Sequence, residues 1–509
     1  MKRLFFLAAL LCGILRAQDD SLIVASVGPY RISTADLLTS YEFGSAFVKR
    51  RSEPLREHLK YMIYERLLAL EGLQNSKREV EFVKERINAL EEDGAVEQLY
   101  RQEILSQVKL SDEQIANDTR KAKINVSLRW IYCHSKDEAD LTSQSIGSGA
   151  SFDSLYSVQF DSTMSSDSRM LETTLLKLER DNSELATALA ALNTGSISLP
   201  VPGKDGYYIF RLDKAEQNPL ITENEFTELK HQAVEIRKKL IADGLADEYV
   251  KNIMKQNDPV IKAEGFNILR AYLADRGLSR DTKVQWEIPS TFMTEAGPQP
   301  IRNSGNYLHR PLVTFGSRTM TIRDYAAWYD IRQFQFDTHS QEAFNSSVKR
   351  TIWKMVQDKL LSEEAYKRGL DKIPAVAHET KKWEAKLLYL SQRAAVLRTI
   401  SATDSALQVF FRTNRKQYIN EKGKPAEFQE VRELVKADYF TKEEAVVLLR
   451  TVEALRKKFS VSVNEQLLKR LSVATVRDPR AIEAVFYKPG GTFPRVAFPT
   501  IDEAWSTIQ

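Results

Sequence analysis

Alternating apolar residues near the start of the chain give way to a helical pattern. Residues 23–32 read Ile-Val-Ala-Ser-Val-Gly-Pro-Tyr-Arg-Ile, which predicts a strand, a tight turn and a short return strand. Ser33 and Asp36 follow with the spacing of a helix-capping box. From residue 55 to residue 109 apolar residues recur at helical spacing, so we expect a helical module after the hairpin.

The pattern changes in residues 124–216. Apolar side chains first alternate as in a half-buried strand, and helix-start signals, a Gly-Ser-Gly break and two late apolar runs follow. The expected elements, in order, are a strand at 126–132, helices from Ser135, at 152–160 and at 185–192, and strands at 197–201 and 206–212. This β-α-α-α-β-β order predicts a small antiparallel sheet packed against helices, so the expected fold class is α+β.

A long charged helix is expected after this domain. Thr222 and Glu225 form another capping box, and apolar residues continue at helical spacing to about Ile253. Beyond residue 258 the pattern weakens, and two prolines and a glycine between residues 298 and 305 indicate a linker.

The second half of the chain repeats signals of the first. The turn and cap of residues 27–36 return at 315–324, and Leu67-Leu68 returns as Leu360-Leu361. A heptad-spaced stripe stands in place of the first helical stretch: Leu387, Leu390, Ala394 and Leu397. The alternative is chance similarity between charged helices, but the shared spacing favours an internal duplication.

These patterns divide the chain into seven parts. We expect a signal peptide at 1–17, a hairpin with a helical module at 18–123, the α+β domain at 124–216, a long charged helix at 217–258, a linker at 259–310, a second helical module at 311–425 and a C-terminal region at 426–509.

The first residues have the order of a secretory signal peptide. Lys2 and Arg3 precede the apolar run 4–15, and Ala17 offers a small residue at the cleavage position. Cys12 does not indicate a lipoprotein, because the two residues before it are bulky leucines. The alternative is an uncleaved amphipathic anchor. We expect cleavage and export to the periplasm or cell envelope, with no stable membrane span in the mature chain.

Charge and composition exclude several classes of function. The formal net charge is +4, and the leader carries three of the positive charges, so no basic excess for nucleic-acid binding remains. No two of the six histidines have the spacing of a helical zinc site, and no glycine-rich phosphate loop is present. We therefore expect no metal and no cofactor. Cys133 is the single cysteine beyond the leader, so no intramolecular disulfide is expected.

Residues 124–216 resemble the parvulin family of peptidyl-prolyl isomerases, with its PpiC-type domain. The strongest match is residues 191–201, Ala-Leu-Asn-Thr-Gly-Ser-Ile-Ser-Leu-Pro-Val, supported by Arg129-x-Ile131, by Gly-Ala-Ser-Phe-Asp-Ser-Leu at 149–155 and by Gly-Tyr-Tyr-Ile at 206–209. With the preceding hairpin and helices, the chain is similar to exported foldases of the SurA, PrsA and PpiD type. The resemblance implies a parvulin-like domain among helical chaperone modules, and it offers a degenerate second copy as one interpretation of residues 426–509.

The proline pocket that the resemblance implies is degenerate here. Trp130 and Tyr208 stand where parvulins usually carry histidines, Ser162 falls where Asp or Cys is common, and Leu185 replaces the usual pocket aromatic. Trp130 and Tyr208 could stack in place of the histidines, or they could be ordinary sheet-core aromatics, which the sequence favours. No catalytic residue can therefore be assigned, and enzymatic activity stays undecided.

Three functions fit the sequence. The first is an extracytoplasmic chaperone that binds unfolded or nascent exported polypeptides, with outer-membrane proteins among the candidate clients. The second is a peptidyl-prolyl cis-trans isomerase with an altered pocket. The third is a structural adaptor of the envelope that has kept the fold.

Overall fold

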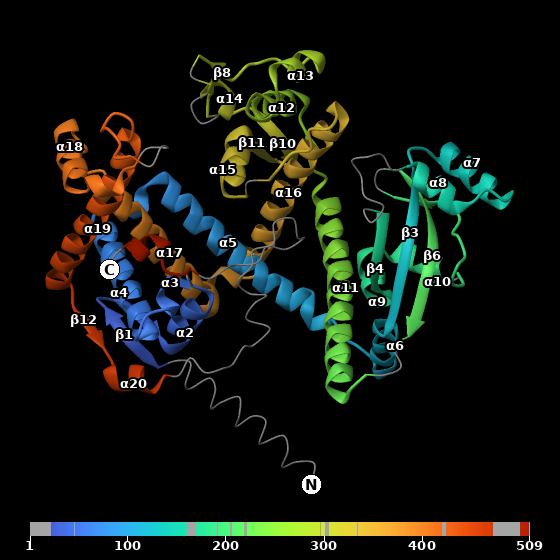
Figure 1. Ribbon diagram of the computed structural model, residues 1–509, viewed down its shortest axis with the longest axis horizontal. Coiled ribbons are helices and arrows are strands. Elements are labelled where there is room, and N and C mark those ends of the chain that lie inside the picture. The colour runs from blue at the N-terminus through green and yellow to red at the C-terminus, as the bar shows by residue number, and fades with distance from the viewer. Residues whose placement is uncertain are drawn as a thin grey trace, which may run out of the picture. The chain divides into compact units, whose positions relative to one another are not determined.

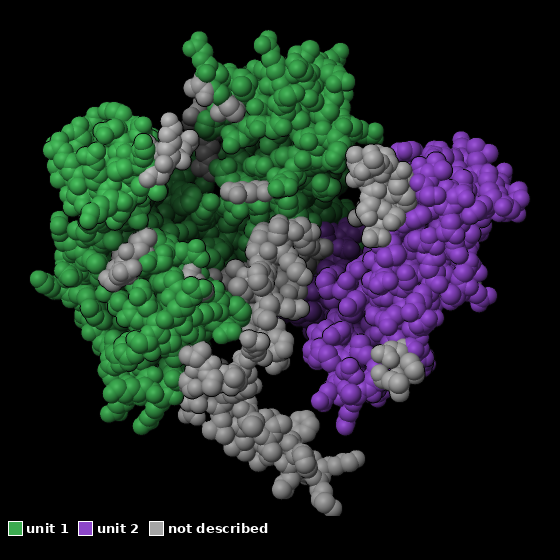
Figure 2. All heavy atoms as spheres, viewed as in Figure 1, with its two compact units in different colours: residues 1–99, 252–509 green, residues 100–251 purple. Residues whose placement is uncertain are grey.

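The structure is a computed structural model that describes residues 22–44, 46–159, 169–190, 192–203, 206–217, 221–295, 297–300, 305–332, 334–419, 424–471 and 499–507. The expected signal peptide lies outside the described residues. The chain forms two compact units: unit 1 holds residues 1–99 and 252–509, and unit 2 holds residues 100–251 (Figure 2).

Unit 1 begins with the predicted hairpin. Strands β1 and β2 pair antiparallel around Gly28, whose φ of +53° suits glycine, and Ser33 with Asp36 makes both hydrogen bonds of the predicted capping box. A third strand, β12, joins the free edge of β1 from far along the chain. The elements of this part are β1 (Ile23–Val27), β2 (Tyr30–Ser33), α2 (Thr34–Phe43), α3 (Ala46–Lys49), α4 (Pro54–Gln74), α5 (Glu81–Glu103) and β12 (Val461–Val463).

The same order of elements occurs a second time in unit 1. A hairpin turns at Gly316 with a φ of +58°, its register shifts at the position that corresponds to the first, and a third strand pairs with its first strand. A helix and two long helices again follow, separated by a residue in the left-handed conformation, Ser76 in one half and Gly369 in the other. These elements are β7 (Val260–Ile261), β10 (Pro311–Phe315), β11 (Arg318–Thr321), α15 (Ile322–Arg332), α16 (Gln341–Lys367) and α17 (Pro374–Leu397).

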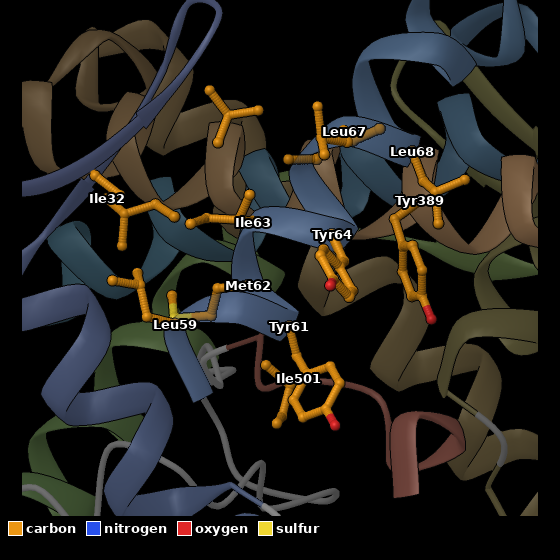
Figure 3. Close-up of a cluster of buried hydrophobic side chains, with 14 of the residues drawn as sticks. Ile32, Leu59, Tyr61, Met62, Ile63, Tyr64, Leu67, Leu68, Tyr389 and Ile501 are labelled. Carbon is orange, nitrogen blue, oxygen red and sulfur yellow. The ribbon is translucent and has the colours of Figure 1, made fainter. Parts of the chain in front are cut away.

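The last long helix of the second half packs on the first half. Helix α17 lies along α4, and both contribute to the largest apolar core of unit 1 (Figure 3). The crossing is close at Gly72, where a Cβ would lie 2.9 Å from the backbone oxygen of Leu388. Of the predicted heptad stripe, Leu387 is buried and Leu397 packs against the core, whereas Leu390 and Ala394 are exposed. The face that α17 buries also includes Ala385, Leu388, Tyr389 and Gln392.

Residues 259–310 form structure where a linker was expected. Helix α12 packs beneath the second hairpin, and the carboxylate of Asp275 accepts hydrogen bonds from Lys283 Nζ (2.7 Å) and the Phe292 backbone nitrogen (2.8 Å). Pro298, one of the residues that indicated a linker, lies in a short strand that pairs with its neighbour. The elements are α12 (Ala263–Gly277), α13 (Arg280–Gln285), β8 (Met293–Thr294), β9 (Gly297–Pro298) and α14 (Gly305–Leu308).

The region beyond residue 400 is helical where the structure describes it. Its elements are α18 (Asp404–Thr413), α19 (Arg432–Lys458) and α20 (Glu465–Arg470), followed by a short 3-10 turn η7 (Glu503–Thr507). Within the described residues of 426–509 the one strand is β12, which completes the first hairpin rather than a parvulin-like sheet. The Pro/Gly-rich stretch around residues 490–494 lies outside the described residues.

Unit 2 contains the α+β domain. A four-stranded antiparallel sheet, in the order β4-β3-β6-β5, has helices on both faces, and α11 runs alongside it (Figure 1). The elements are α6 (Asp112–Ala122), β3 (Ile124–Cys133), α7 (Lys136–Gly147), α8 (Phe152–Val158), β4 (Met170–Thr174), α9 (Leu175–Asp181), α10 (Ser183–Ala190), β5 (Val201–Pro202), β6 (Tyr207–Gln217) and α11 (Glu223–Asn257). The sequence prediction missed β4 and α9, and the strand expected at 197–201 is a bridge at Ile197 with the short β5.

A partly buried ion cluster around Asp118 attaches α11 to this domain. Arg237 on α11 donates to both oxygens of Asp118 at 2.7 Å and to Glu179 at 2.8 Å, and Lys121 also contacts Glu179. Since Asp118 lies on α6, this helix belongs with unit 2 rather than with the first helical module, to which the sequence assigned it. In the part of the chain that the structure describes, no helix combines the length and apolarity needed to cross a bilayer.

Candidate functional site

The sheet of unit 2 separates two small cores. Alternation along β3 places Leu128, Trp130 and Tyr132 toward α9 and α10, and it places Ile131 and Cys133 toward α7 and α8. The predicted pocket residues that the structure describes, Trp130, Leu185 and Tyr208, belong to the first face. Its chemistry therefore decides what the domain can do.

Aromatic rings cover the first face where it is only partly buried. Trp130 pairs with Phe210 across the strands at a ring separation of 6.3 Å, Tyr208 stacks on Phe210 at 5.9 Å, and Tyr132 lies 5.4 Å from Tyr208. These separations are typical of favourable aromatic pairs. The result is a continuous aromatic strip of Trp130, Tyr132, Tyr208 and Phe210.

The structure brings three of the four predicted site residues together. Trp130 and Tyr208 are half-buried in the strip, and Leu185 on α10 is buried in the same apolar cluster. Ser162 lies outside the described residues. The arrangement fits both expectations for the aromatics, because they pack in the sheet core and still keep one edge accessible.

This face offers an apolar surface with few groups for proton chemistry. His134, the histidine nearest to the strip, is exposed and meets only the edge of Tyr132 at 4.9 Å. Isomerisation of an X–Pro bond needs a dry, oriented pocket that grips a twisted amide. Among the described residues no group of three or more His, Cys, Asp or Glu side chains could hold a metal ion.

Ion pairs hold helix α8 against the opposite face of the sheet. Arg129 donates to both oxygens of Asp213 at 2.7 and 2.8 Å and to Asp153 at 2.8 Å, and Arg211 reaches Asp153 at 2.7 Å. Hydrogen bonds from the two guanidinium groups lower the pKa of Asp153, which keeps it ionised and holds α8 against the sheet. Arg129, a residue of the parvulin resemblance, therefore has a structural role here.

Unit 1 contains a second candidate site, a cleft that the sequence did not predict. Helices α5, α15 and α16 and the second hairpin enclose a cleft with a volume of about 580 Å³. We call it the α5–α16 cleft. Its apolar lining includes Phe315, Met320, Ala327, Trp328, Ile331 and Met355.

Charged side chains form the floor of the α5–α16 cleft. Arg332 donates to both oxygens of Asp93 at 2.7 and 2.5 Å, and its Nε lies 3.4 Å from Asp358, to which Trp328 Nε1 donates at 2.9 Å. Burial raises the pKa of Asp93, and the Arg332 guanidinium opposes that rise. Burial likewise raises the pKa of Glu92 at the same cleft.

The residues that line this cleft do not form a contiguous sequence motif. Glu92 and Asp93 look like ordinary members of a charged helix, and Arg332 lies 239 residues from Asp93. The available signal was the set of aromatic residues at the end of α15, where Trp328 and Tyr329 precede Arg332. Such a set is more often core than binding surface, so the sequence alone does not distinguish it.

No protein-family model matches the chain, and no curated relative matches it. Solved structures do match. PrsA from Bacillus cereus, a peptidylprolyl isomerase, is 17% identical with a TM-score of 0.22, and the match covers 45% of this chain and 92% of that one.

Two further structures have similar statistics. PrsA from Bacillus subtilis is 19% identical with a TM-score of 0.17, covering 46% of this chain and 93% of that one. A structure from the Campylobacter jejuni pair PEB4 and Cj1289, described as SurA-like chaperones, is 13% identical with a TM-score of 0.21, covering 46% and 98%. The chain is similar to PrsA and SurA-like foldases.

Proposed function

We propose that this protein is an extracytoplasmic chaperone that binds unfolded polypeptides. The observation that carries the proposal is the α5–α16 cleft, whose apolar walls and charged floor suit an extended peptide of mixed sequence. Apolar client side chains would contact Trp328 and Met355. Client backbone and charged groups would meet Glu92 and Lys359 at its edge.

Export belongs to the same proposal. The leader-like order of residues 1–17 is the support for export, and the matched C. jejuni proteins include one described as periplasmic. Nascent exported chains are then the client class, with outer-membrane proteins as one candidate group. The parvulin-like domain would act as a second peptide-contacting surface through its aromatic strip.

Filling the α5–α16 cleft should reduce chaperone activity. Ala89 on α5 lines the cleft and is only half-buried, so Ala89→Trp would place an indole in the space that a client needs. We expect about tenfold weaker binding of an unfolded client, which corresponds to about 1.4 kcal/mol. The measurement is light scattering of an aggregating client together with affinity for the same client held unfolded.

The matched control is Ala394→Trp, which adds the same indole at an exposed position of α17. Both variants should keep the circular dichroism of the wild type. Equal suppression of aggregation by the wild type and Ala89→Trp would exclude the cleft as the client site. No suppression by the wild type would exclude the chaperone proposal.

A prolyl isomerase is the second candidate, favoured by the accessible edge of the aromatic strip. Because tyrosine and tryptophan replace the usual histidines, we expect little acceleration of X–Pro isomerisation in a short peptide. Trp130→Ala should instead lower the free energy of unfolding by about 2 kcal/mol, less than for a fully buried tryptophan, because Trp130 is half-buried. A peptide isomerisation assay and denaturant unfolding on both proteins test this. Strong wild-type isomerisation that a folded Trp130→Ala protein loses would establish the enzyme.

A further inference from the structure

A short segment of the chain occupies an aromatic cleft in unit 1. Residues 499–507, which we call the Trp505 segment, insert Trp505 between α4 and α17, and its side chain is fully buried. The indole lies 5.8 Å from the ring of Tyr61, 5.6 Å from Tyr64 and 6.0 Å from Tyr389. Figure 3 shows these three tyrosines and Ile501 in one cluster.

Polar contacts set the register of the segment. Glu65 Oε1 accepts from the backbone nitrogen of Asp502 at 2.7 Å and from Trp505 Nε1 at 3.2 Å. Tyr389 donates its hydroxyl to Asp502 Oδ2 at 2.9 Å. Residues of the cleft thus contact a backbone N–H, an acidic side chain and, three residues later, an aromatic ring.

Glu65 has a partner in the cleft besides the segment. Lys386 on α17 donates to both oxygens of Glu65 on α4 at 2.8 and 2.9 Å, so the buried carboxylate keeps a partner when the segment leaves. The cleft walls are side chains of two long helices that pack along each other. The segment itself adds one 3-10 turn, and residues 471–498 separate it from α20 in the sequence.

We propose that this cleft is a second peptide-binding site, selective for a short segment with an acidic residue three positions before an aromatic one. The Trp505 segment is its resident occupant and competes with other peptides. Because it belongs to the same chain, a free peptide faces an effective concentration on the order of millimolar. The assignment of such peptides as unfolded clients rests on the proposed chaperone function; the binding site itself does not.

The test uses the full chain and a labelled peptide with the sequence of residues 499–507. Trp505→Ala removes the anchor of the resident segment, and we expect this variant to bind the peptide at least about tenfold more tightly than the wild type, by fluorescence anisotropy. A peptide with alanine in place of its tryptophan should not bind. Equal affinity of the wild type and a folded Trp505→Ala protein would overturn the proposal, as would equal binding of the alanine peptide.

A milder variant covers the case in which Trp505→Ala does not fold. Asp502→Ala removes the acceptor of Tyr389 but leaves the buried indole in place. We expect a gain in peptide affinity of a few fold, and an unchanged affinity would then overturn the proposal. Aggregation assays on the same proteins separate the two ideas: peptide binding without any suppression of aggregation supports this site and excludes the chaperone role.

Discussion

Replacing Arg332 by methionine should lower the free energy of unfolding by about 3–5 kcal/mol at neutral pH. Arg332 is 7% exposed and pairs with Asp93, which is 9% exposed, at the floor of the α5–α16 cleft. Methionine fills a similar volume but leaves the Asp93 carboxylate buried without its charge partner. The cost is the desolvation of that carboxylate, and urea unfolding monitored by circular dichroism measures it.

The loss should shrink as the pH falls. Burial already raises the pKa of Asp93 in the folded protein, and removing the guanidinium raises it further. The folded variant therefore binds more protons than its unfolded chain between the ordinary Asp value of about 3.9 and the raised value. Stability of the variant relative to the wild type then increases on acidification between the Asp93 pKa of the folded variant and the lower Asp93 pKa of the folded wild type, and decreases as the pH rises through that range.

Arg318→Met is the matched control for this prediction. Arg318 lines the same cleft and pairs with Glu363, but the two side chains are 44% and 34% exposed. An exposed pair contributes less than about 1 kcal/mol, so this variant should stay close to the wild type. Similar losses in both variants would show that the cleft as a whole, and not the buried charge, had been disturbed.

Local signals were sufficient to predict many individual elements. The hairpins at Gly28 and Gly316 follow from glycine at a left-handed turn position, and helix starts at Ser33 and Ser135 follow from capping side chains that make the expected hydrogen bonds. The alternation of apolar residues along 126–132 predicted strand β3 and the face of the sheet on which Trp130 lies. These features depend on a few neighbouring residues.

Packing between distant segments could not be predicted in the same way. Helix α17 packs on α4 through a face that includes Lys386 and Gln392, so the buried face coincides only in part with the apolar heptad stripe. Strand β4 has exposed and half-buried residues and no apolar alternation, which explains why it was missed. Segment 259–310 is short of regular apolar spacing because turns interrupt it.

The candidate sites also differ in whether they depend on local signals or on packing between distant segments. Trp130 and Tyr208 of the aromatic strip could be singled out from the sequence, because both lie on expected strands. In the structure these two strands pair with each other. The α5–α16 cleft and the Trp505 cleft were not predictable, because each combines residues more than 200 positions apart, such as Asp93 with Arg332 and Glu65 with Trp505. A charge on a helix gives no sign of the partner that buries it.

Lys386→Met should lower the free energy of unfolding by about 3 kcal/mol. Lys386 and Glu65 form a buried pair between α17 and α4, and methionine leaves the Glu65 carboxylate with only the Asp502 N–H and the Trp505 indole as donors. Those two donors keep the expected loss at the lower end of the usual range for a broken buried pair. Denaturant unfolding of the purified full chain measures the loss.

Two further variants make this test specific. Glu65→Gln in the Lys386→Met protein removes the unpaired charge and retains an oxygen that can accept from Asp502 and Trp505, so it should recover at least half of the lost stability. Lys458→Met breaks a pair with Glu71, which lies on α4 like Glu65. Because Lys458 is 47% exposed, this variant should lose less than about 1 kcal/mol of stability. A double variant as unstable as Lys386→Met alone would contradict the charge argument and indicate that the packing of the lysine methylenes between α4 and α17 holds the two halves together.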